Sequence, residues 1–184
     1  MIQFLSQDPH DFQLSEFKDH LRLFTDEDDP AASRALDAAV VAFENWTGVL
    51  LRRTTVQQNA DDFIPPFKAA YRPVLTDPPF TMVKTDISVD PFVDEDVTDS
   101  YFLALDLGGP VFRRRPRGKD NYRLSNYTLT YDAGSTAYSA PMKMCVFGIG
   151  ALFYENRELA NEARLEKVPV GYRTLIETYR DGSI

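Results

Sequence analysis

The sequence contains one cysteine, two histidines and one tryptophan among its 184 residues. The lone cysteine, Cys145, excludes a disulfide bridge within the chain, so we expect a buried, unreactive thiol and a reducing site of synthesis. His10 and His20 have no cysteine or further histidine at a metal-binding spacing. We therefore interpret both histidines as surface residues and expect no metal site.

A long apolar run is also missing. A membrane-spanning helix needs about 20 consecutive, mostly apolar residues, and no segment of the chain supplies them. Residues 1–12, MIQFLSQDPHDF, have neither the basic start nor the apolar stretch of a secretory signal. We therefore expect no membrane association and synthesis in the cytoplasm.

Positive charge is scarce, because the chain has 20 Lys and Arg residues but 28 Asp and Glu residues, which gives a net charge of −8. This balance argues against a protein whose whole surface binds nucleic acid or anionic lipid. Residues 113–119 are nevertheless strongly basic, and Pro116 and Gly118 indicate a loop. The loop either contacts DNA phosphates or an acidic neighbouring subunit, or it is a solvated hairpin tip, which is the commoner case. Its candidate contact residues are Arg113, Arg114, Arg115, Arg117 and Lys119.

Motifs of catalysis and cofactor binding are absent. Residues 148–150, Gly-Ile-Gly, follow no strand and open no helix, as a dinucleotide-binding loop must, and there is no phosphate-binding loop or nucleophile elbow. We predict that the chain is not an enzyme and binds no cofactor. A hydrolase whose two carboxylates meet only in the folded chain stays open as a less favoured hypothesis.

One acidic segment invites a calcium interpretation but does not fit it. The segment lacks the glycine and the bidentate acid that an EF-hand loop places in register, so we expect a solvated acidic loop. Its acids are Asp90, Asp94, Glu95, Asp96 and Asp99.

The most apolar stretch of the chain is residues 139–158, SAPMKMCVFGIGALFYENRE. From Ala140 to Tyr154 the only charge is Lys143, and no polar face remains, which predicts a helix buried on most sides. Ser139 is positioned to cap it, with proline tolerated in the first turn. We expect Gly148 and Gly150 to let another backbone pack closely.

Two further helices precede this stretch. Residues 14–24 place Leu14, Phe17, Leu21 and Phe24 on one face, which is typical of an amphipathic helix. A second helix is predicted to start at Asp29 and Pro30 and to stop at Gly48, forming a hairpin with the first. Its small residues permit close approach of a neighbour, either the 139–158 helix or a second copy of the chain. The candidate packing residues are Ala35, Ala38, Ala42, Trp46, Gly148 and Gly150.

The chain ends in a last short helix, where Tyr172, Leu175, Ile176 and Tyr179 share one face. Such a helix docks either on its own bundle or on a partner protein. Residues 159–167 before it either extend the central helix or form a loop.

Between the helices, residues 49–138 alternate apolar and polar side chains and contain proline-rich connections. Strands are predicted at residues 50–57, 81–89, 101–107 and 127–131. The fold class is therefore α+β: a helical bundle formed by the N- and C-terminal helices, residues 1–48 and 139–184, with an inserted small, mostly antiparallel β-sheet subdomain at residues 49–138.

Several segments carry a resemblance to a known family. The run TLTYDAG at 128–134, the apolar helix ending in FYENRE at 153–158 and VPVGYRTLIETYR at 168–180 resemble the head-tail connector (adaptor) proteins of long-tailed phages and gene transfer agents. Residues 16–55 resemble the opening helix pair of the same family. Phe153 replaces a tryptophan that is usual there, and residues 57–120 have no dependable match.

The resemblance implies a structural virion protein made in the bacterial cytoplasm and located at the head-tail interface. It would form a homo-oligomeric ring, typically of twelve copies, beneath the portal protein and above the next tail or stopper protein. Double-stranded DNA would pass through the lumen without sequence-specific binding, and an acidic chain suits that passage. The last helix would dock on the portal through Tyr172, Leu175, Ile176, Tyr179 and Arg180. The alternative function is a DNA-binding module that uses the basic loop.

Overall fold

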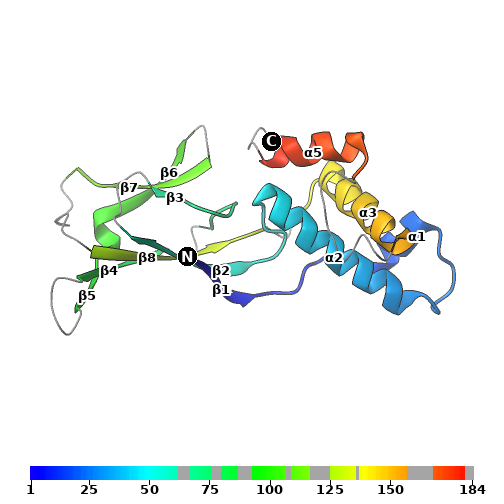
Figure 1. Ribbon diagram of the computed structural model, residues 1–184, viewed down its shortest axis with the longest axis horizontal. Helices are drawn as coiled ribbons and strands as arrows, with labels where there is room; N and C mark the ends of the chain where they lie inside the picture. Colours follow the sequence, from blue (N-terminus) through cyan, green and yellow to red (C-terminus); the bar gives the residue numbers. More distant parts are fainter. Residues whose placement is uncertain are drawn as a thin grey trace. The chain divides into compact units, whose positions relative to one another are not determined.

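The computed structural model describes residues 1–61, 67–75, 80–86, 93–106, 109–116, 125–135, 137–156 and 168–180. The chain forms two compact units (Figure 1). A sheet unit contains Met1–Pro9 and Arg52–Ser135, and a helical unit contains His10–Leu51 and Thr136–Ile184. The predicted α+β class is confirmed. The predicted boundary was wrong for residues 1–9, because they pair with the sheet rather than join the helices.

Four described helices build the helical unit, and they share one apolar core. The helices are α1 (Leu14–Leu21), α2 (Asp29–Thr47), α3 (Ala140–Glu155) and α5 (Val170–Arg180). The helices α2, α3 and α5 each contact the other two, and α1 packs on α2 and α3. Fully buried side chains from all four helices meet in the core, including Phe17, Phe43, Ile149 and Ile176. None of the helices in the described part of the chain is long and apolar enough to span a membrane.

The helix α3 forms as its sequence predicts. The Ser139 side chain accepts a hydrogen bond from the backbone N–H of Met142, and Pro141 lies in the first turn. Every residue from Cys145 to Gly150 is buried, which is expected of a helix without a polar face. The helix is thus the central element of this unit, and residues 157–167 after it lie outside the described part.

The first helix is shorter than predicted. It ends at Leu21 because Arg22 adopts a left-handed conformation with φ of 59°, which terminates a helix. Phe24 therefore lies in the following loop and is 94% exposed, so its assignment to the apolar face was wrong. The second helix ends as predicted at Gly48, whose φ is 67°.

The sheet unit holds two antiparallel sheets. The larger has the order β1 (Ile2–Gln7), β2 (Thr54–Asp61), β8 (Ser125–Ala133), β4 (Thr81–Asp86) and β5 (Val93–Asp96). The smaller has the order β3 (Phe67–Lys68), β7 (Gly109–Arg114) and β6 (Tyr101–Asp106). The antiparallel pairing was predicted, whereas β1, β3, β5 and β7 were not.

The two sheets pack together through aromatic side chains. The ring of Phe112 on β7 lies 5.7 Å from the ring of Tyr131 on β8, and Phe80 packs on Phe112 at 4.8 Å. The Tyr131 hydroxyl accepts hydrogen bonds from the backbone N–H groups of Ala70 and Tyr71. Burial raises the pKa of Tyr131 to about 12. Buried apolar residues include Val56, Met82 and Leu129 on the larger sheet and Val111 and Phe112 on the smaller.

Candidate interaction surfaces

The terminal helix α5 is anchored to its own chain. Ile176 is fully buried and Tyr179 is 5% exposed. The Tyr179 hydroxyl lies 2.9 Å from the Ser139 hydroxyl, and its ring packs edge-on against Phe43 at 5.6 Å. The prediction that Ile176 and Tyr179 contact a portal protein therefore needs correction, because in this arrangement both side chains hold α5 on the helical unit.

Some of the residues predicted to dock on a portal protein remain at least partly accessible on α5. Tyr172 and Leu175 are half-buried against the core, and Arg180 is exposed. Val170, which the sequence did not single out, is 73% exposed. A partner that approaches this helix would therefore meet Val170, Arg180 and the outer edges of Tyr172 and Leu175.

The small residues predicted for packing are largely used inside the chain. Ala35 and Ala42 are buried, and Ala38 and Trp46 pack against the same core. A Cβ atom added at Gly148 would overlap the ring of Tyr172, and one at Gly150 would lie 2.8 Å from the ring of Phe17. The expected close neighbour of each glycine was a backbone, but it is an aromatic ring of the same chain.

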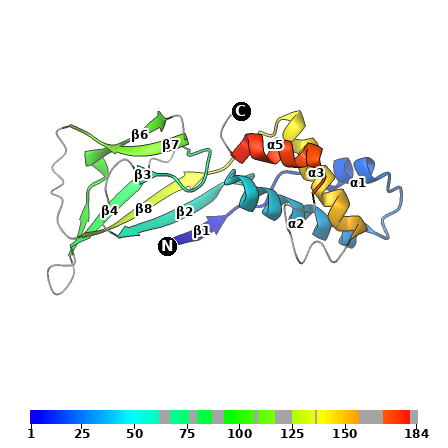
Figure 2. The same cartoon turned by 45° about the horizontal axis from the view of Figure 1, so that its top comes forward.

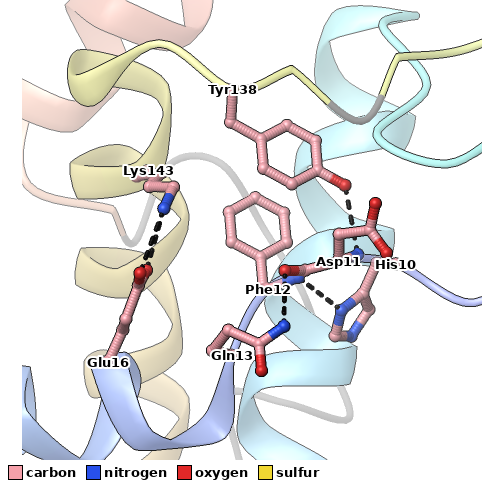
Figure 3. Close-up of polar contacts among 7 residues, drawn as sticks. All are labelled: His10, Asp11, Phe12, Gln13, Glu16, Tyr138 and Lys143. Carbon is pink, nitrogen blue, oxygen red and sulfur yellow. Dashed lines mark hydrogen bonds and ion pairs between the residues drawn. The ribbon is translucent and has the colours of Figure 1, made fainter.

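One tyrosine ties three segments of the helical unit together (Figure 3). The Tyr138 hydroxyl accepts a hydrogen bond from the backbone N–H of Asp11 at 3.3 Å and donates one to the carbonyl of Leu51. Its ring stacks on Phe12 with a centroid distance of 4.2 Å and an interplanar angle of 3°. The chain passes between the two units after residues 9, 51 and 135. Asp11, Leu51 and Tyr138 each lie in the helical unit within three residues of one of these passages. Tyr138 thus links the three segments of the helical unit where the chain enters or leaves it.

His10 is part of this cluster rather than a surface residue, which corrects the sequence-based interpretation. Its Nε2 atom lies 2.9 Å from Oδ1 of Asp37, and its Nδ1 atom accepts a hydrogen bond from the backbone N–H of Phe12 at 3.3 Å. Since Nδ1 accepts, Nε2 carries the ring hydrogen and donates it to the carboxylate. The side chain of His10 is only 14% exposed, whereas His20 is exposed as predicted.

The basic segment begins on a strand. Arg113 and Arg114 belong to β7, so their predicted loop placement was wrong, and Arg115 follows directly. Arg113 and Arg115 are exposed, whereas Arg114 is half-buried. The Arg115 side chain donates from Nε to the carbonyl of Tyr101 at 3.2 Å. Two of the predicted contact arginines are therefore exposed residues, while Arg117 and Lys119 lie outside the described residues.

Part of the acidic segment forms an edge strand rather than the predicted loop. All four residues of β5, Val93–Asp96, are exposed. Asp94 accepts a hydrogen bond from the Thr85 hydroxyl at 2.7 Å. Hydrogen bonds from the side chain and backbone of Thr98 lower the pKa of Asp96. Within the described ranges, no group of three or more His, Cys, Asp or Glu side chains could hold a metal ion. Asp90 lies outside these ranges.

The fold is similar to that of chains in gene transfer agent (GTA) particles. The chain matches one in the neck of an empty GTA particle with C6 symmetry, with a TM-score of 0.72 and 24% identity over 98% of this chain and 95% of that one. A chain in the virion of a native GTA particle gives 0.71 and 23%, with 98% and 95% covered. A chain in the neck of a native GTA particle with C12 symmetry gives 0.69 and 22%, with 98% and 94% covered. No family model and no curated protein matches the chain.

Proposed function

We propose that the chain is a structural adaptor in the neck of a gene transfer agent or related phage-like particle. It forms a ring of twelve copies under the portal protein, joins the DNA-filled head to the tail and lets double-stranded DNA pass. The observation that carries the proposal is the likeness of fold, over nearly the full length of both chains, to chains from GTA necks. The sequence segments that resemble connector proteins support it independently.

The charge distribution suits a channel through which DNA slides. Lys and Arg side chains bind DNA by releasing counterions from its phosphates, and a lumen rich in them would hold the duplex. This chain has a net charge of −8, and its exposed β5 adds three carboxylates to one sheet edge. A surface of this kind repels phosphates and leaves the DNA mobile.

The contact with the portal is assigned to the outward side of α5. Val170 and Arg180 are exposed there, and Ile176 and Tyr179 hold the helix in place from the inner side. A rigidly seated helix loses little conformational freedom on binding, which favours docking. The remaining predicted docking residues, Tyr172 and Leu175, contribute their solvent-facing edges.

The location in the particle is tested by deleting the gene from a producing strain and imaging the particles by electron microscopy. The proposal expects filled heads without attached tails, and expects attachment to return when the wild-type gene is supplied. Normal particles from the deletion strain would refute the proposal.

The α5 assignment is tested by complementing that strain with Arg180→Glu, which reverses an exposed charge. Glu177→Gln, an exposed position on the same helix, is the matched control. We expect Arg180→Glu to reduce tail attachment more than the control does, and melting temperatures of both purified variants separate a lost contact from a loss of stability. Equal attachment by both variants would remove α5 from the portal contact and leave the neck role standing.

The alternative function, a DNA-binding module, rests on exposed Arg113 and Arg115. Filter binding to duplex DNA between about 50 and 200 mM salt separates the two functions, since each phosphate contact steepens the salt dependence. The adaptor proposal expects no measurable retention at any salt concentration. Tight binding that weakens steeply with salt, and that is lost in Arg113→Glu/Arg115→Glu, would favour the DNA-binding module.

A further inference from the structure

The two sheets of the sheet unit end in edge strands of very different character. Within the described residues, β1 and β5 form the edges of the larger sheet, and β3 and β6 form those of the smaller. An edge strand presents unpaired N–H and C=O groups, and proteins commonly protect such edges with charges, proline or short length. Two of these four edges are protected in this way and two are not.

The strands β5 and β3 are protected. Three of the four residues of β5 are acidic, Asp94, Glu95 and Asp96, and all are exposed. A second strand placed along them would have to desolvate three carboxylates. The strand β3 has only two residues, Phe67 and Lys68, which is too short to support a further ladder.

Among the described strands, β1 and β6 each pair on one side only and lack such protection. From Ile2 to Gln7 the sequence IQFLSQ has no charge, every residue is exposed, and Phe4 and Leu5 are 42% and 50% exposed. The sequence of β6, YFLALD, has no charge until its last residue, and Leu105 is 85% exposed. Both strands have six residues. Within β6, Tyr101 is buried and residues 102–104 are half-buried, so its exposed apolar surface is at Leu105. Uncharged, apolar edge strands of this length are templates for pairing with another strand.

The two open edges lie on opposite sides of the sheet unit. In both views, β6 lies on the upper side of the sheet unit and β1 on its lower side (Figure 2). A closed ring requires contacts between two different surfaces of each subunit, since a surface that pairs with itself creates a two-fold dimer and stops there. Two different open edges on opposite sides of one unit meet this requirement.

We propose that β1 of one copy pairs with β6 of the next copy, so that the sheets continue from subunit to subunit around the ring. This inference rests on the proposed ring assembly and names the surfaces that build it. Backbone hydrogen bonds between the edges provide the affinity, and Phe4, Leu5 and Leu105 are covered by the neighbouring copy. The acidic β5 stays outside this contact and prevents the wrong edge from pairing.

Cross-linking tests the pairing in purified particles. We place one cysteine on each open edge, in Gln3→Cys and Leu105→Cys, both exposed positions. A short bismaleimide then tolerates a small change of register. Cys145 stays in place, because it is fully buried and burial raises its pKa to about 12, so its thiolate is unavailable to the reagent.

The double variant is expected to give a ladder of covalent oligomers that extends beyond the dimer, and each single variant is expected to give none. A ladder is possible only if the two edges of different copies meet. Efficient dimers from Gln3→Cys alone would indicate that β1 pairs with itself, and monomers only from the double variant would indicate that the edges do not meet. Either result overturns the inference.

A charge placed on either open edge should block assembly. Leu5→Lys and Leu105→Lys change exposed side chains, so each variant should keep the wild-type melting temperature. Each should nevertheless reduce incorporation into particles about tenfold or more, because the contact between copies would bury a lysine. Val93→Lys on β5, where Val93 is 56% exposed, is the matched control and should incorporate normally. Normal incorporation of both edge variants would refute the pairing while the neck role stands. Absence of the wild-type chain from the particles would instead refute the proposed function.

Discussion

Replacing Gly148 on α3 by alanine should destabilise the packing of α5 against α3, and the size of the effect should depend on Tyr172. An alanine Cβ at this position would overlap the tyrosine ring at its Cζ, Oη and Cε1 atoms. The ring must then leave its place over α3, at a cost of about 1 to 3 kcal/mol that is typical of overpacking. Alanine also favours the helix by about 1 kcal/mol over glycine. The net loss of unfolding free energy is therefore about 0 to 2 kcal/mol.

The change in unfolding free energy caused by Gly148→Ala should reverse its sign when Tyr172 is truncated. In a Tyr172→Ala background the ring no longer occupies the space above residue 148, so Gly148→Ala should stabilise the chain by about 1 kcal/mol through helix propensity. The double-mutant cycle should give a coupling energy of about 2 kcal/mol. Gly150→Ala is the control, because its added Cβ would meet the fully buried Phe17 ring at 2.8 Å. The Tyr172→Ala background should not rescue it.

The assay is urea unfolding followed by the fluorescence of Trp46. This residue is the only tryptophan, it lies on α2, and it packs against the core that α5 covers. Its signal therefore reports on the helical unit even where the two units unfold separately. Additive effects of Gly148→Ala and Tyr172→Ala, within about 0.5 kcal/mol, would refute the argument that the tyrosine ring occupies the space above the glycine.

Three further predictions concern single side chains. Tyr138→Phe removes the donor to the buried carbonyl of Leu51 and should lower the unfolding free energy by about 1 to 2 kcal/mol, as measured by Trp46 fluorescence; an unchanged midpoint would contradict this. Cys145, with its pKa raised to about 12 by burial, should not react with a thiol reagent at pH 8 until denaturant is added, and rapid labelling of the native chain would contradict its burial. The pKa of Tyr131 is raised from 10.0 to about 12, so the unfolded state ionises first and stability should fall by about 3 kcal/mol as pH rises across that interval. Circular dichroism melts at stepped pH should show this fall, and Tyr131→Phe should reduce it.

The helices were the most predictable part of the fold. The helix α3 has a serine cap, an early proline and no polar face, and these local features are sufficient to define it. The left-handed Arg22 could not be predicted in the same way, because a non-glycine residue rarely adopts a positive φ. For that reason Phe24 was assigned to the helix that ends before it.

The sheet edges were harder to predict from sequence. The strand β1 is exposed along its whole length, so it lacks the alternation of buried and exposed residues by which a half-buried strand is recognised. Arginines at 113–115 and the acids at 94–96 are typical of loops, yet pairing with neighbouring strands places most of them in β7 and β5. Long-range pairing outweighed local composition at these positions.

The candidate surfaces required the three-dimensional arrangement. The periodicity of residues 172–179 correctly identified one apolar face of α5, but it could not tell whether that face covers its own chain or a partner. Burial of Ile176 and Tyr179 assigns the face to the chain's own core. Likewise, small residues such as Ala35 and Gly148 indicated close packing, and only the fold identified the neighbours as α3 and Tyr172.

The most direct test of the neck assignment is a cryo-electron microscopy reconstruction of particles that carry this chain. We expect a rotationally symmetric layer between portal and tail into which copies of the sheet unit and the helical unit fit, with β1 of each copy beside β6 of the next. A complete neck whose density accommodates neither unit, in particles that are infectious or transfer DNA normally, would contradict it.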